Sequence, residues 1–407
     1  MKMKPLCFAL VLILGLPFAL PAQDIGYFVN LGETNNPELR ALRLRYDLAG
    51  EKVEEAGALP DTEFGVGFYV PEMQTRTGAQ TARFSIRQML PAFGQITARE
   101  AYAASMAEAE YLDWVIARRQ LRLQIAQGYF KLQAIRQQIG ILRAQGQWLD
   151  SYREVALTSL ETGRASAVDV LRLEIRKNEV EARWQVLENQ YRAASFAFFR
   201  LLNVTETDIG FSVTELPETL PVPEFPELGP HPELEKYDRL YQSVVQEETL
   251  NRKSSGPSFG VGVDYVLMSR LTDIEIDDNG MDMFMPMVSL SVPLFNGSYR
   301  SRTRQNQLRQ ESLEASKTTR RNQLESLLEG AWQEQVSERI RFASQTQNSA
   351  RTRQAIEILL KNYQTDTVDF SELLEMQQME LQWQLERSMA LEGFLSQGAL
   401  VNYLTQE

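Results

Sequence analysis

Two long stretches of the chain carry apolar residues at intervals of three and four positions. The first runs without proline from about residue 95 to residue 161, and its apolar positions include Leu121, Ile125, Tyr129, Leu132, Ile135, Ile139 and Leu142. The second has apolar residues at Val170, Leu173, Val180, Trp184, Leu187, Tyr191, Ala194, Phe198 and Leu201, with Lys177 as the polar exception. This spacing is typical of a coiled-coil seam. It predicts two long paired helices, the first roughly 100 Å long at about 1.5 Å per residue.

Four short segments alternate apolar residues with small or polar ones, which indicates β-strands. They cover residues 64–70, 82–90, 259–265 and 288–294. A sheet built from them would have one apolar and one polar face, as in a membrane barrel with lipid outside and water inside. A soluble sheet with one solvated face shows the same alternation. The very long helices and the export signal described below favour the barrel.

Four landmarks recur in the same order in the two halves of the chain. The matched pairs are residues 36–39 with 231–234, 64–67 with 259–262, 90–94 with 292–296, and 163–171 with 366–374. The offset between matched residues increases mainly between the two strand segments of a half. This predicts a longer hairpin loop in the second half. Pro37 and Pro232 suit the first turn of a helix. The pattern predicts an internal duplication, in which each half reads helix, strand, strand, long helix, helix.

The N-terminus has the features of a secretory signal peptide over residues 1–22. Lys2 and Lys4 precede an apolar run, and Ala22 ends a small-residue cleavage pattern. Cys7, the only cysteine, lies inside this leader at a position that does not fit a lipid-anchored cysteine. The sequence therefore predicts an exported chain without a lipid anchor and without a thiol after cleavage.

The remaining chain divides into three predicted parts. Residues 24–202 form the first helix-hairpin-helix repeat, and residues 231–407 form the second. Residues 203–230 contain five prolines and are predicted to be an extended linker between the repeats. No later stretch is a convincing transmembrane helix, so any contact with a membrane is expected through β-strands.

Composition excludes several classes of function. The 407 residues are 24% charged and 43% hydrophobic, which is enough to bury a core. The formal net charge of -12 argues against a nucleic-acid partner. A single histidine, His231, supplies neither a catalytic triad nor a metal site, and it is interpreted as a helix-start residue. We expect no enzyme activity and no cofactor.

Open sheet edges predict an oligomer. Four strands cannot close a membrane barrel, for which about eight is the minimum. The unpaired edges would therefore pair with other copies of the chain. Three copies would supply twelve strands.

The doubled plan, the Asn36-Pro37 helix start, the strand exit over residues 88–94 and the turn over residues 163–171 together resemble the TolC-like outer-membrane efflux factors. The resemblance covers about residues 24–404. It implies a mainly α fold with β-strands: a homotrimer with a twelve-stranded transmembrane β-barrel and a long α-helical coiled-coil barrel in the periplasm. It also implies docking to a periplasmic membrane fusion protein and an inner-membrane pump. The strand exit and the run from Met283 to Met287 look most like members that serve heavy-metal pumps of the resistance-nodulation-division type.

The resemblance implies a gate at the periplasmic tip, where the turns between paired helices lie. Residues 363–375 align with the second tip of the family and put Glu372 and Glu375 on its two gate carboxylate positions. Three copies would set rings of carboxylates around a narrow bore, which attract cations and repel one another. Capping and first-turn charge at helix N-termini would explain Asp169, Glu372 and Glu375 without a gate.

Asp169 and Tyr363 match a hydrogen-bonded pair that holds the tip of the family shut. The arginine of that lock is replaced here by Val368. The resemblance therefore implies a weaker lock, or one that uses another cation, for which Arg164 is the candidate.

Two sets of residues are candidates for the lining of a lumen. In the strand phase that turns Val288 and Leu290 toward lipid, the opposite face carries Met283, Met285 and Met287. Thioethers suit Cu(I), although adaptable packing explains the same run. Arg83 and Arg87 would contribute basic rings, or they are solvated strand residues without a role in selectivity.

The sequence thus predicts an outer-membrane exit duct whose helical part lies in the periplasm. It would conduct small toxic solutes, metal ions among them, passively from a pump to the exterior. A duct for type I protein secretion has the same features. A periplasmic coiled-coil scaffold or adaptor is a further alternative, but an adaptor would need an additional module for which no sequence remains.

Overall fold

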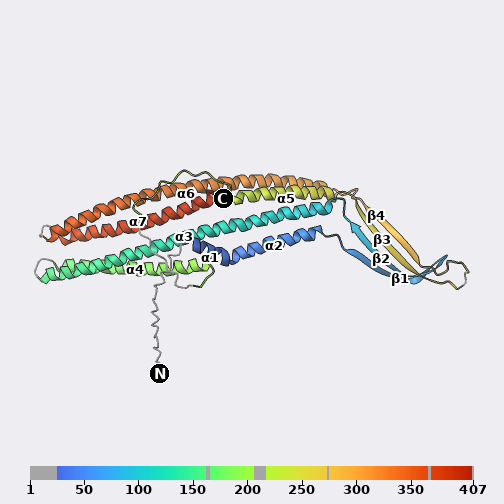
Figure 1. Ribbon diagram of the computed structural model, residues 1–407, viewed down its shortest axis with the longest axis horizontal. Helices are drawn as coiled ribbons and strands as arrows, with labels where there is room; N and C mark the ends of the chain where they lie inside the picture. The colour runs from blue at the N-terminus through green and yellow to red at the C-terminus, as the bar shows by residue number, and fades with distance from the viewer. Residues whose placement is uncertain (1–24, 162–165, 206–216, 273–274, 365–367, 406–407) are drawn as a thin grey trace, which may run out of the picture. The chain divides into compact units, whose positions relative to one another are not determined.

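The computed structural model describes residues 25–161, 166–205, 217–272, 275–364 and 368–405 (Figure 1). Its elements are α1 (Ile25–Asn35), α2 (Pro37–Gly57), β1 (Thr62–Thr75), β2 (Gly78–Leu90), α3 (Gln95–Glu161), α4 (Ala167–Leu201), α5 (Pro232–Ser254), β3 (Ser258–Ser269), β4 (Met283–Ser291), α6 (Ser298–Gln364) and α7 (Phe370–Thr405). The order helix, strand, strand, long helix, helix occurs from α2 and again from α5, as predicted for each half. The predicted signal peptide, residues 1–22, lies outside the described residues. Helix α1 is an element that the periodicity did not predict.

Local sequence explains where α2 and α5 begin. The side chain of Asn36 accepts hydrogen bonds from the backbone N–H groups of Glu38 and Leu39, at 2.9 and 3.1 Å. The imidazole of His231 accepts one from the N–H of Glu233, at 3.3 Å. A proline follows each cap, where its missing N–H costs nothing. Both predicted helix starts, including the interpretation of His231, are confirmed.

The chain forms two compact units, and each draws on both halves of the sequence. Among the described residues, the helical unit comprises those within 25–35, 125–220 and 341–392, and the sheet unit comprises those within 36–124, 221–340 and 393–405. The 67-residue helices α3 and α6 each contribute residues to both units.

The predicted seam forms the core of the helical unit. Leu142 and Leu173 are buried in one cluster with Leu373 and Leu385 of α7. The cluster also contains Ile135, Ile139, Leu149, Ala156, Val180, Leu187, Phe370 and Leu374. Lys177, the polar exception in the seam, pairs with Asp150 of α3 at 2.5 Å. No described helix combines the length and the apolar composition that crossing a membrane requires.

The sheet unit contains one antiparallel sheet in the order β1-β2-β3-β4. The two predicted hairpins, β1-β2 and β3-β4, are joined by the pairing of β2 with β3, so that β1 and β4 are the edges. The last strand differs from its prediction, because β4 begins at Met283 and ends at Ser291 rather than covering residues 288–294. Ser291 pairs with Ser258, the first residue of β3, so β4 ends where its partner strand begins.

Candidate functional site: a two-faced sheet and a helical tip

One face of the sheet is apolar and exposed. Directly opposed residues on paired strands point to the same side, so Phe64, Ile86 and Val263 form one row across β1, β2 and β3. Exposure is high at Phe64 (76%) and at Val288 of β4 (80%). Other exposed residues of this face are Val66, Phe68, Phe84, Val261, Tyr265, Phe284 and Leu290. An apolar surface of this kind is disfavoured in water.

The opposite face carries the residues predicted to line a lumen, which are Arg83, Arg87, Met283, Met285 and Met287. Their strand partners show this: Gly262 of β3 lies opposite Arg87 on one side and Met287 on the other. Val266 lies in the same way between Arg83 and Met283. The structure therefore brings the two arginines and the three methionines to one face, while their lining of a lumen stays a prediction.

Asp264 occupies the centre of this polar face. Its strand partners are Ser85 and Met285, and its side chain is completely buried and paired with Arg83. The Oδ1 atom has no hydrogen-bond partner among the described residues. The ion pair joins β2 to β3 and thus the first hairpin to the second.

The charge of the polar face weighs against a cation site at its methionines. The guanidinium groups of Arg83 and Arg87 lie on the same face as the thioethers, and only Arg83 is paired with a carboxylate, that of Asp264, in the described contacts. Like charges repel a bound cation. The described residues contain no group of three or more His, Cys, Asp or Glu that could hold a metal.

At the tip of the helical unit, Asp169 belongs to a capping box at the start of α4. The hydroxyl of Ser166 accepts from the N–H of Asp169 at 3.3 Å, and the carboxylate of Asp169 accepts from the N–H of Ser166 at 3.0 Å. Arg172 lies 3.9 Å from the same carboxylate. A capping box stabilises the first turn of a helix. Asp169 therefore has a structural role within its own chain.

Tyr363 belongs to an aromatic cluster that joins the ends of three helices. Its ring centroid lies 5.3 Å from that of Phe370, which lies 6.0 Å from that of Tyr152. Trp148 stacks on Tyr152 at 3.9 Å. Burial raises the pKa of Tyr152. The cluster holds the end of α6 and the start of α7 against α3.

Glu372 and Glu375 lie exposed in the first two turns of α7. Glu375 lines a groove of about 410 Å³ together with Arg172 and Arg176 of α4. The cations of α4 therefore lie beside one of the two predicted gate carboxylates.

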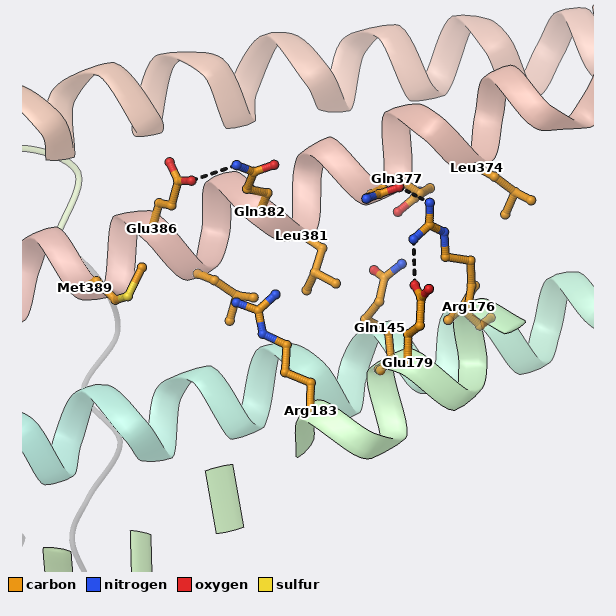
Figure 2. Close-up of a pocket in the computed structure, with 14 residues that line it drawn as sticks. Gln145, Arg176, Glu179, Arg183, Leu374, Gln377, Leu381, Gln382, Glu386 and Met389 are labelled. Atoms are coloured by element: carbon orange, nitrogen blue, oxygen red, sulfur yellow. Dashed lines mark hydrogen bonds and ion pairs between the residues drawn. The ribbon is translucent and has the colours of Figure 1, made fainter. Parts of the chain in front are cut away.

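A second groove, of about 280 Å³, lies between α3, α4 and α7 (Figure 2). Its lining is made of leucines, a valine, a methionine, glutamines and charged residues. Arg176 pairs with Glu179 at 2.6 Å, and the amide of Gln382 donates a hydrogen bond to Glu386 at 2.8 Å. The lining contains no Ser, Cys, His or Tyr side chain. The groove offers hydrogen bonds and apolar contact, but no nucleophile with an adjacent base.

Comparison with known proteins identifies the architecture. No family model and no curated protein matches the chain. The outer-membrane channel OprN matches at 17% identity with a TM-score of 0.74, over 93% of this chain and 89% of that one. VceC, an outer membrane protein of Vibrio cholerae, matches at 15% identity and 0.73, over 93% and 95%. The CmeC outer membrane channel of Campylobacter jejuni matches at 13% identity and 0.73, over 93% and 85%.

The chain has the fold of the TolC-like outer-membrane channels.

The lock at the tip that the resemblance implies stays a prediction. Arg164, the candidate replacement cation, lies outside the described residues. Among the described contacts of a single chain, Asp169 bonds to Ser166 and no hydrogen bond joins it to Tyr363. The gate roles of Glu372 and Glu375 are likewise predictions.

The burial of two charged residues, Asp264 and Glu380, was not predicted from the sequence. The alternation along β3 places Asp264 on the polar face, and this much could be predicted. Its pairing with Arg83 could not, because the two residues are 181 positions apart in the sequence. Glu380 of α7 is buried and accepts from Ser349 and Arg353, both at 2.8 Å, and from Gln384 at 2.6 Å. A charged residue inside a helical pattern gives no sign of burial before its neighbours are known.

Proposed function

We propose that three copies of this chain form the outer-membrane exit channel of a tripartite efflux system. The observation that carries the proposal is the two-faced sheet with open edges. Its exposed apolar face fits a lipid environment, and its polar face fits a water-filled path. The channel has no chemistry of its own, and an inner-membrane pump supplies the energy.

Contact with lipid would remove the apolar side chains of the sheet from water, which is favourable in free energy. Removing a side chain such as Phe64 or Val288 from water stabilises by about 1.5–3 kcal/mol, and the face carries many such residues. Phe93 and Phe295 lie just beyond the helix-side ends of β2 and β4 and are 96% and 100% exposed. Aromatic residues at this level are typical of the border between acyl chains and headgroups.

The open edges support an oligomer. Strands β1 and β4 each have one side without a strand partner in the described chain. Four strands per copy and three copies give a twelve-stranded barrel, with the helices forming a periplasmic tube. A periplasmic membrane fusion protein would connect this tube to the pump, and small toxic solutes, with metal ions as a candidate cargo, would pass through it.

The test is the state of the full-length chain in bacterial outer-membrane fractions. We expect a heat-modifiable trimer on gels and discrete conductance steps in planar bilayers. A soluble monomer in the periplasm would exclude a channel.

A further inference from the structure

The last turns of α2, which lead into edge strand β1, carry an unpaired acidic stripe. Glu51, Glu54 and Glu55 are three and four positions apart, so they lie on one side of the helix. All three are exposed, and none forms an ion pair in the described part of the chain. The last turn contains no basic residue.

The first turns of α6, which follow edge strand β4, carry the opposite charge. Arg300, Arg302 and Arg304 are exposed, and no described carboxylate pairs with them. Arg304 donates to the amide of Gln307 at 3.2 Å, and Arg302 lies 5.9 Å from the ring of Tyr299. The first turn of α6 contains no acidic residue.

Both charged clusters are unfavourable for the helices that carry them. The C-terminal end of a helix is partially negative and its N-terminal end partially positive. Carboxylates at the end of α2 and guanidinium groups at the start of α6 therefore repel their own helix dipoles. Each cluster has the charge that would relieve the other.

The sheet brings these clusters to corresponding levels on opposite edges. Thr62 at the start of β1 lies in one row across the sheet with Gln88, Val261 and Val288. Val288 is three residues from the end of β4 at Ser291. Figure 1 shows α2 leading into β1 and α6 leaving β4 at the same end of the sheet. Because four antiparallel strands alternate in direction, β1 and β4 run oppositely. The β4 edge of one copy can therefore pair in antiparallel fashion with the β1 edge of the next.

We infer that Arg300 and Arg304 of one copy pair with Glu51, Glu54 and Glu55 of the next copy. The inference rests on the proposed trimer and adds the contact that orients it. Head-to-tail association repeats the same contact around the ring. Complementary charge also opposes the wrong approach, because two basic or two acidic edges repel.

Charge reversal in the full-length chain tests the inference. Arg300→Glu/Arg304→Glu makes both edges acidic, and Glu51→Arg/Glu55→Arg makes both edges basic. We expect each variant to lower the trimer fraction on unheated gels of outer-membrane preparations by about fivefold or more, since like charges meet at every contact. The four substitutions combined restore opposite charges and should bring the fraction to within about twofold of the unaltered chain.

Arg321→Glu/Arg351→Glu is the matched control. It makes the same change in net charge on the same helix, at exposed arginines without an ion pair in the described contacts, and should leave the trimer fraction unchanged. The inference is overturned if the reversed variants form trimers normally, or if the combined variant is not rescued. An unaltered chain that never forms a trimer overturns the proposed function itself.

Discussion

His231 begins α5 with an imidazole, which is an unusual cap, and the reason lies in what surrounds it. The ring packs edge-on against Tyr403 at 5.2 Å, and burial lowers its pKa to about 4. Burial opposes the ionisation of neighbouring Glu233, but hydrogen bonds from Arg320 and Tyr403 outweigh it and lower that pKa. The histidine is thus neutral at pH 7, with Nδ1 free to accept the N–H of Glu233.

The depressed pKa of His231 makes stability depend on pH. Between about pH 6.5 and pH 4 the unfolded chain binds more protons than the folded chain, so stability is fully present above this window and falls as the pH drops through it. His231→Asn keeps a capping side chain but removes the titration. We expect the loss of unfolding free energy between pH 7 and pH 4.5 to shrink by about 1–2 kcal/mol in the variant. Thermal unfolding of the helices followed by circular dichroism at both pH values measures this, and an unchanged pH dependence would contradict it.

The pair of Arg83 with Asp264 predicts an unequal response to substitution of its two members. Asp264 is fully buried, whereas Arg83 is about one third exposed. Arg83→Met leaves a buried carboxylate without a cation and should cost about 2–3 kcal/mol, while Asp264→Asn retains an acceptor and should cost about 1 kcal/mol. The temperature at which the proposed trimer dissociates on gels should fall further for Arg83→Met than for Asp264→Asn. Equal shifts would mean that water reaches Asp264 freely.

At the scale of elements, periodicity rather than hydrophobicity decides which residues of α4 are buried. Leu173 is 1% exposed, whereas Leu171 and Ile175 are 57% and 58% exposed, although all three are apolar. The three-four spacing selects Leu173 and leaves out its neighbours. A coiled-coil seam can be predicted from the sequence because it depends on residues within one turn of each other.

Alanine substitution at these positions separates the seam from the surface. Leu173→Ala should lower the unfolding free energy by about 2–4 kcal/mol, because it opens a cavity among close-packed side chains. The same change at Leu171 should cost less than about 1 kcal/mol. Denaturant titration of the purified protein compares the two, and equal losses would show that the single-chain seam does not govern stability.

Features that depend on contacts between distant parts of the chain could not be predicted from the sequence. The element order and both helix caps were predictable from local patterns such as the Asn36-Pro37 start. The pairing of β2 with β3 was not, because no local signal specifies which hairpin edges meet. The burial of Glu380 depends on how α6 packs against α7, and the grooves beside α4 depend on how α3, α4 and α7 pack. No single segment of the sequence specifies either arrangement.

For the whole molecule, the exposed carboxylates at the start of α7 predict ion selectivity. If Glu372 and Glu375 form rings around the bore, Glu372→Gln/Glu375→Gln should lower the preference for potassium over chloride by about threefold or more. Reversal potentials in planar bilayers under a salt gradient measure this ratio. Glu311→Gln/Glu314→Gln removes the same charge from exposed positions of α6 and should change nothing. A selectivity that is equal in both variants would place the gate elsewhere.

The exposed apolar face of the sheet also constrains how the proposed trimer can assemble. A single copy would be unstable in either environment. In water its sheet exposes apolar side chains such as Phe64 and Val288. In a bilayer the unpaired backbone groups of edge strands β1 and β4 would face hydrocarbon. If three copies form the proposed channel, insertion into the membrane and closure of the ring are therefore expected to proceed together.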